Sequence, residues 1–135
     1  LVTHTTYDIV DENGRYISSR VAQNLNYKKL LNSCDIGLST VILHKKILKN
    51  KIFPNIKTKE DYVLWLKIAK SGVIFYGINL KLTKWRDTPS SLSKSSYIKI
   101  KDAFRVYYTY EQFNLIKTIF RVLILSVNFL KKKWQ

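Results

Sequence analysis

The segment that most constrains the fold of this chain covers residues 58–72. It opens with Thr-Lys-Glu-Asp, which combines a favoured helix-capping residue with the acidic side chains that the positive end of a helix attracts. A largely apolar run follows at residues 62–69, and Gly72 stands where a glycine commonly ends a helix. We predict a helix here with Thr58 as its N-cap. Because its apolar side chains must be buried, the rest of the chain has to build a core around it.

Shorter signals surround this helix. Asn13-Gly14 favours a tight hairpin between two strands, because both residues tolerate a positive φ angle. Asn26 suits the cap of a short helix. We predict strands at residues 1–10, 15–19, 38–43, 73–78 and 80–85, helical turns at 27–33 and 44–49, and a serine-rich loop at 86–96. This mixture of strands and helices predicts an α/β fold.

The composition fits one globular unit. The chain has 135 residues, of which 46% are hydrophobic and 13% aromatic, so one packed core is expected and wholesale disorder is not. Cys34 is the single cysteine, which excludes an internal disulfide, and His4 and His44 have no zinc-ligand spacing. No signal-peptide pattern opens the sequence, and a reducing, cytoplasmic location is expected. The chain begins at Leu1 and lacks methionine, so we expect it to be a piece of a longer protein.

The charge is strongly positive. Lysine and arginine number 24 against 9 acidic residues, a formal net charge of +15. Such a balance indicates an anionic partner, namely phospholipid, polyphosphate or nucleic acid, although a lysine-rich genome would produce the same excess. Nucleic acid is disfavoured because the lysines are dispersed and no RNA- or DNA-binding motif is present.

The region from residue 97 onward has a helical pattern. At 100° per residue, residues 113–133 place a polar stripe (Asn114, Lys117, Thr118, Arg121 and Asn128) opposite a broad apolar face. Lys117 and Arg121 interrupt the apolar residues too often for a transmembrane span. Two interpretations stay open. The helix and its Lys-Lys-Lys-Trp ending anchor the protein to an anionic membrane surface, or the apolar face packs on the domain or on a second subunit.

Four segments together resemble family 2 glycosyltransferases, and the resemblance spans residues 1–100. The first is Thr-Thr-Tyr-Asp-Ile-Val-Asp-Glu-Asn-Gly at 5–14, and the second is Ile-Gly-Leu-Ser-Thr-Val at 36–41. The third, Lys-Glu-Asp-Tyr-Val-Leu-Trp-Leu-Lys at 59–67, is similar to the family's Glu-Asp-x-x-Leu-Trp-Leu pattern. The last is Trp85-Arg86 followed by Ser91-Leu92-Ser93.

This resemblance implies the second, acceptor-side half of a GT-A, Rossmann-like nucleotide-diphospho-sugar transferase fold, followed by C-terminal amphipathic helices. The implied division is 1–96 for the acceptor-side part and 97–135 for a basic helical tail. The parent enzyme is then a bacterial inverting transferase that moves a sugar from a nucleotide-sugar to a polysaccharide or lipid-linked acceptor at the inner face of the plasma membrane. A divalent metal, Mg or Mn, is implied, but no Asp-x-Asp motif occurs here and its ligands are expected elsewhere. We therefore expect the isolated chain to be inactive.

The same resemblance assigns the general base to Asp61. A carboxylate in the first turn of a rigid helix can take the proton of an acceptor hydroxyl as it attacks the anomeric carbon. The alternative is that Asp61 caps the helix in a capping-box arrangement with Thr58. Glu60 is the second choice for catalysis, with an orienting role or a lysine pair as its other interpretation.

The remaining site predictions concern substrate contacts. Trp65 is expected mainly in the core, with an indole edge that could meet a sugar face. Ser39 and Thr40 fall in the segment that lines the acceptor side of the family's site. Arg86, Ser91 and Ser93 suit a flap over a diphosphate, because arginine offers two parallel donors. Many relatives have a histidine two residues after this arginine, whereas Thr88 stands here, so metal contact by the flap is not expected.

A different class of function also fits the sequence. A non-catalytic basic module, descended from a transferase and binding a membrane or, less readily, nucleic acid, would keep Asp61 only as a helix cap.

Overall fold

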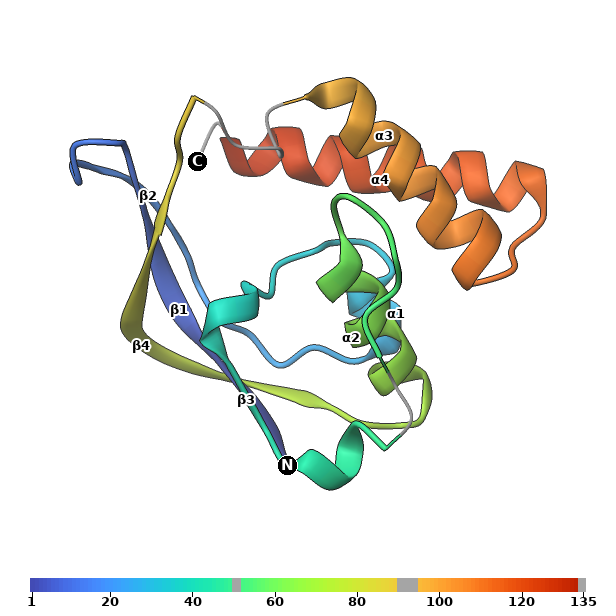
Figure 1. The fold of residues 1–135 in the computed structure, drawn as a ribbon, viewed down its shortest axis with the longest axis horizontal. Helices are drawn as coiled ribbons and strands as arrows, with labels where there is room; N and C mark the ends of the chain where they lie inside the picture. Colours follow the sequence, from blue (N-terminus) through green and yellow to red (C-terminus); the bar gives the residue numbers. More distant parts are fainter. Residues whose placement is uncertain (50–51, 90–94, 134–135) are drawn as a thin grey trace.

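The computed structural model describes residues 1–49, 52–89 and 95–133. Its centre is a mixed sheet built on β1 (Val2–Val10) (Figure 1). The strand β4 (Phe75–Arg86) runs parallel to β1 along its full length. The other edge of β1 pairs antiparallel with β2 (Tyr16–Arg20) at one end and β3 (Val41–Leu43) at the other. The predicted α/β class is confirmed.

The turn between β1 and β2 forms as the Asn-Gly signal predicted. Gly14 has a φ of +83°, and its N–H donates to the carbonyl of Asp11 at 3.1 Å. The Asp11 carboxylate accepts two further backbone N–H groups, from Asn13 and Arg15. Local hydrogen bonds thus close the turn.

The prediction of two strands after residue 72 was wrong, because β4 is one continuous strand. Its pairing with β1 shifts between Thr5 and Thr6, where Thr5 faces Ile78 but Thr6 faces Lys81. The Thr6 hydroxyl donates to the side-chain oxygen of Asn79 at 2.9 Å. This contact satisfies a polar group at the irregularity and lets the strand continue instead of turning.

Between β2 and α2, the described residues form three short helical turns. Asn26 caps α1 (Tyr27–Leu30), since its side chain accepts the N–H of Lys29, as predicted. The predicted strand at 38–43 is only half right. Residues Leu38–Thr40 form a 3₁₀ turn, η1, in which the Thr40 hydroxyl donates to the Gly37 carbonyl, and only β3 is extended. A second 3₁₀ turn, η2 (Lys45–Ile47), follows.

The predicted central helix is α2 (Glu60–Lys70), and it supplies much of the core. Tyr62 and Trp65 are its largest buried side chains. The Tyr62 hydroxyl lies 2.9 Å from that of Tyr107, and Trp65 meets Phe75 edge to face at 5.5 Å between ring centroids. The other buried residues of α2 are Val63, Leu64, Leu66, Ile68 and Ala69.

The N-cap prediction was wrong. Lys59, in the left-handed region with φ +66°, occupies the cap position, and its side chain makes no capping bond. Thr58 is not available because its N–H and hydroxyl both donate to the carboxylate of Asp102, at 3.0 and 2.8 Å. Hydrogen bonds to a residue 44 positions away thus replace the capping bond that Thr58 was predicted to make.

The C-terminal region forms α3 (Ser96–Arg105), a π-helical turn η4 (Val106–Tyr110) and α4 (Leu115–Lys133). Figure 1 shows α3 and α4 side by side. Thr118 is fully buried, and two other polar residues of α4 contact α1's C-terminal neighbour Asn32: Arg121 donates to its side-chain oxygen at 2.6 Å and Asn128 to its carbonyl at 2.8 Å. Thr118, Arg121 and Asn128 of the polar stripe therefore face the protein, whereas Asn114 and Lys117 are exposed.

The apolar face of α4 points outward. Six of its side chains are between 48% and 82% exposed, and we call them the outer stripe: Ile116, Ile119, Phe120, Leu123, Val127 and Leu130. The interpretation in which this face packs on the domain is thus wrong for these six residues. Within the described residues, no helix combines the length and apolarity needed to cross a bilayer.

Candidate active site

The first turn of α2 opens into a groove of about 890 Å³. Asp61 and Lys59 contribute to one wall, together with Tyr7 of β1 and Ser39 of η1. The helices α3 and α4 provide the opposite wall. The groove is of the size that holds a small-molecule ligand.

Asp61 is half-buried at this wall. Its carboxylate accepts the N–H of the next residue, Tyr62, at 2.7 Å. Burial raises the pKa of Asp61 above its ordinary value, and the neighbouring charge of Glu60 raises it further, while the Tyr62 hydrogen bond and Lys59 oppose the shift. The positive end of α2 favours the ionised carboxylate, and this effect is outweighed by burial. A carboxylate with a raised pKa is a stronger base once it has lost its proton.

The position of Asp61 depends on α3. Asp102 of α3 is 3% exposed, and it holds the backbone and hydroxyl of Thr58 just before the helix begins. Lys59 then turns through a left-handed conformation into the first residue of α2. The anchor at Thr58 and the buried body of α2 fix both sides of the first turn, so the Asp61 backbone has little freedom.

Other polar groups share this wall. Burial raises the pKa of Tyr7 to about 12, so its hydroxyl keeps its proton at neutral pH and can donate a hydrogen bond. Arg20 at the end of β2 and Asp35 before η1 also line the groove. The wall thus combines carboxylates, neutral hydroxyls and cationic side chains.

The opposite wall is mainly apolar. Its residues from α3 are Ser96, Lys99, Ile100 and Ala103, and those from α4 are Leu125, Ser126, Phe129 and Leu130. Lys99 is the charged side chain in this set, and its ammonium lies 4.9 Å from the centre of the Phe129 ring. Trp85, 41% exposed at the end of β4, also lines the groove.

The sequence-predicted residues divide between groove and surroundings. Asp61 and Ser39 line the groove. Thr40, a predicted substrate contact, is buried and uses its hydroxyl on Gly37, so it is not available to a ligand. Glu60 is half-buried beside the groove and acts on Asp61 through its charge.

Trp65 does not reach the groove, which corrects the suggestion that it meets a sugar. Only 2% of its surface is exposed, because β4 covers it through Phe75. Arg86 lies exposed at the end of β4, outside the groove lining, and donates to the carbonyl of Glu12 in the hairpin. Ser91 and Ser93 lie outside the described residues.

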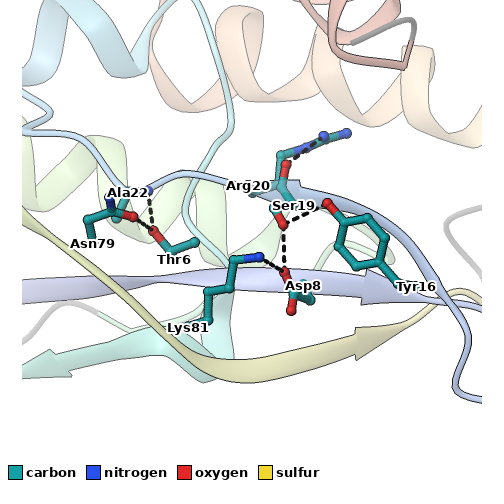
Figure 2. A network of polar contacts seen from close by, with 8 residues as sticks. All are labelled: Thr6, Asp8, Tyr16, Ser19, Arg20, Ala22, Asn79 and Lys81. Carbon is teal, nitrogen blue, oxygen red and sulfur yellow. Dashed lines mark hydrogen bonds and ion pairs between the residues drawn. The ribbon is translucent and has the colours of Figure 1, made fainter.

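A polar network lies on the sheet near the groove (Figure 2). Asp8 accepts the Ser19 hydroxyl at 2.5 Å and pairs with Lys81 at 3.0 Å, and these contacts hold the pKa of its carboxyl below the ordinary value. Asp8 alternates with Tyr7 along β1, so the two side chains point to opposite faces of the sheet. Arg20 extends away from the Asp8 carboxylate in Figure 2. The network ties β1, β2 and β4 together behind the groove.

The described residues do not form a metal site. They contain no group of three or more histidine, cysteine or acidic side chains close enough to share an ion. The acidic residues that line the groove are Asp61 and Asp35. A metal held by this part of the chain alone does not fit, and we derive no step through one.

Sequence reasoning missed several groove residues. Tyr7 and Trp85 belong to the recognised motifs, yet nothing local showed that they line the same groove as Asp61. Lys99 lies in a segment without any motif. The sequence predicted only that Lys99 lies on a helix. The packing of that helix against α4, which brings Lys99 to the groove, is a tertiary contact that no local pattern predicts.

The chain is similar to curated bacterial proteins that are named as glycosyltransferases. Over 95 residues it is 39% identical to the Escherichia coli protein named UDP-Glc:alpha-D-GlcNAc-diphosphoundecaprenol beta-1,3-glucosyltransferase WfaP. The matched region covers 70% of this chain and 34% of that protein. The similarly named Escherichia coli protein WfgD is 33% identical over 99 residues, with 70% of this chain and 38% of that protein covered.

A longer match reaches the teichuronic acid biosynthesis glycosyltransferase TuaG of Bacillus subtilis (strain 168). The identity is 26% over 131 residues, or 96% of this chain and 52% of that protein. The chain thus spans about half the length, or less, of these curated relatives. No family model matches it.

Proposed function

Because the chain belongs with the bacterial glycosyltransferases, we propose that its protein moves a sugar from a nucleotide-sugar to a lipid-linked or polysaccharide acceptor, with Asp61 as general base. The observation that carries the proposal is the Asp61 carboxylate, held at the start of a buried helix and facing the groove with a raised pKa. The relatives named as glucosyltransferases, with a UDP-sugar donor and a diphosphoundecaprenol acceptor, support this substrate class.

The proposed reaction is an inverting displacement. The acceptor hydroxyl attacks the anomeric carbon of the donor, Asp61 takes the hydroxyl proton, and the bond from the anomeric carbon to the nucleoside diphosphate breaks. The new glycosidic bond and the released diphosphate balance the step. General-base assistance of this kind is worth about 10²–10⁴-fold in rate.

We further propose that residues 1–96 form the acceptor-side half of a GT-A fold and that 97–135 form a basic tail. The strand β4 is an edge of the described sheet and carries exposed apolar side chains, among them Ile78, Leu80 and Leu82. Such an edge is normally covered in a complete protein. The part of the relatives that this chain does not match is long enough to contain further strands.

Two elements of the proposal lie outside the described groove. A Mg or Mn ion bound in the complete enzyme would offset the charge of the leaving diphosphate, with ligands from outside this chain. The flap of Arg86, Ser91 and Ser93 stays a prediction for the same diphosphate.

The transfer assay tests the proposal directly. The full-length protein is incubated with radiolabelled UDP-sugars and a GlcNAc-diphospho-polyprenol in detergent, and labelled lipid is extracted. Label in the lipid phase supports the function, and its absence across a panel of donors and acceptors rejects it. Transfer by residues 1–135 alone would refute our expectation that this part is inactive by itself.

We also propose that the outer stripe of α4 contacts an anionic membrane surface at the inner face of the plasma membrane. Its six apolar side chains are exposed, and Lys117 and Lys131 lie exposed on the same helix. Apolar insertion flanked by lysines is the usual arrangement of an interfacial helix. Flotation with anionic vesicles, with and without residues 113–135, tests this. Equal flotation of both forms would reject the contact and leave a purely catalytic module.

A further inference from the structure

The apolar wall of the groove continues onto the outside of the molecule. Leu130 belongs both to the groove lining and to the outer stripe of α4, and Phe129 beside it is also exposed. An apolar path therefore leads from the interior of the groove to the exposed face of the helix. Exposed apolar area of this kind indicates a ligand or a membrane surface.

A cation is held on this path. The ammonium of Lys99 lies 4.9 Å from the centre of the Phe129 ring, close enough for a cation–π contact. Lys59 lines the other wall, beside Asp61. The groove thus joins three chemistries: a base, cationic side chains and an apolar surface that leads outward.

We propose that the α3–α4 wall binds the isoprenoid chain of a polyprenyl-diphosphate-linked acceptor, with Lys99 at the diphosphate. The inference rests on the proposed transferase function and adds a binding site to it. A lipid-linked acceptor of this class carries its sugar, its diphosphate and its apolar chain in one line. The groove offers Asp61 to the sugar hydroxyl, Lys99 to the phosphates, and Phe129 and Leu130 to the chain.

The size of the groove determines how much of the acceptor it encloses. A volume of about 890 Å³ holds the sugar diphosphate and the first part of the chain. The remaining isoprene units leave the groove over Leu130, near the C-terminal end of α4. The enzyme then recognises the start of the lipid, and the far end stays in the membrane.

Binding to the full-length protein in detergent tests the site without any donor sugar. The probes are a polyprenyl diphosphate, the matching polyprenyl alcohol, and a sugar diphosphate with a short water-soluble alkyl group. Phe129→Ala removes the groove contact, and Phe120→Ala is its matched control on the same helix, exposed but outside the groove.

We expect Phe129→Ala to weaken binding of the polyprenyl diphosphate about ten-fold, which is the scale for burying one large apolar side chain. Binding of the short-alkyl probe should weaken less, because that probe loses only the support that Phe129 gives to Lys99. Phe120→Ala should stay within about two-fold, the scale of a surface substitution. Lys99→Gln should weaken the diphosphate probes and not the polyprenyl alcohol.

Two outcomes overturn the site. Equal losses for Phe129→Ala and Phe120→Ala mean that the lipid contacts only the outer stripe, and unchanged binding in Phe129→Ala and Lys99→Gln means that it binds elsewhere. The result is separable from the transfer assay: selective lipid binding without sugar transfer would reject the catalytic proposal and keep the site.

Discussion

The helices α2 and α4 are similar in apolar content, but α2 buries its apolar side chains whereas α4 exposes many of them. In α2 the apolar side chains are buried around Tyr62 and Trp65, and the polar first turn faces the groove. In α4 the polar stripe packs inward through Thr118 and Arg121, and the apolar stripe is exposed. The contrast shows that an amphipathic pattern predicts a helix, whereas its partner decides which face is buried.

The reason lies in the segment that α4 covers. Asn32 presents a side-chain oxygen and a carbonyl, and both accept from α4. Leaving such partly buried polar groups unpaired costs more than exposing a leucine does. The polar face therefore turns inward, and the apolar face is left for another surface.

The largest expected effect is a matched pair of leucine deletions in the full-length protein. Leu66→Ala in α2 should lower the free energy of unfolding by about 2–5 kcal/mol, because Leu66 is fully buried. Leu123→Ala in α4 should change it by less than about 0.5 kcal/mol, because that side chain is exposed. Urea unfolding measures both. Equal losses would mean that α4 buries its apolar face after all.

A second pair concerns the polar faces. Arg121→Ala should cost about 1.5–3 kcal/mol, because its bond to Asn32 is a charge-assisted hydrogen bond in a partly buried place. Lys131→Ala, on the exposed side of the same helix, should stay within about 0.5 kcal/mol. A neutral Arg121→Ala would show that the polar stripe does not hold α4 in place.

The start of α2 allows a smaller test. Thr58→Val removes one of two donors to the buried Asp102 carboxylate and should cost about 1 kcal/mol of stability. The turnover rate should also fall, since Asp61 is positioned from this anchor. Thr58→Ser keeps the hydroxyl and serves as the control. If Thr58→Val loses the expected stability but keeps its turnover rate, the Thr58–Asp102 hydrogen bonds do not contribute to catalysis.

The smallest expected effect is a shift in the pH profile. The acidic limb of kcat/KM should have a midpoint above the ordinary aspartate value of 3.8, because burial raises the pKa of Asp61. Glu60→Gln should move that midpoint down and Lys59→Gln should move it up, since their charges act in opposite directions. Midpoints that do not move in either variant would assign the limb to another group.

The sequence predicted those parts of the fold that depend on local interactions. The Asn-Gly hairpin, the Asn26 cap and α2 itself are set by neighbouring residues. The errors arose where a distant partner intervened: Asp102 took Thr58 from its cap position, and Asn79 met Thr6 and kept β4 in one piece.

The candidate site was predictable to a similar degree. The motif around Asp61 identified the residue that faces the groove, and Ser39 also lies there. The motifs could not show that Phe75 packs against Trp65 or that the Thr40 hydroxyl donates to the Gly37 carbonyl. Lys99 and Phe129 meet only through the packing of α3 on α4, which no local pattern encodes.

The most direct test of the account is Asp61→Asn in the full-length protein, with transfer rate and melting temperature measured together. Because the folded state raises the Asp61 pKa, the ionised carboxylate costs stability at neutral pH, and this cost is relieved as the pH falls from the raised value to the ordinary one. We predict a rate lower by about 10²–10⁴-fold and a melting temperature that is unchanged or higher. Full activity with a lower melting temperature would contradict the account and leave Asp61 as a helix cap.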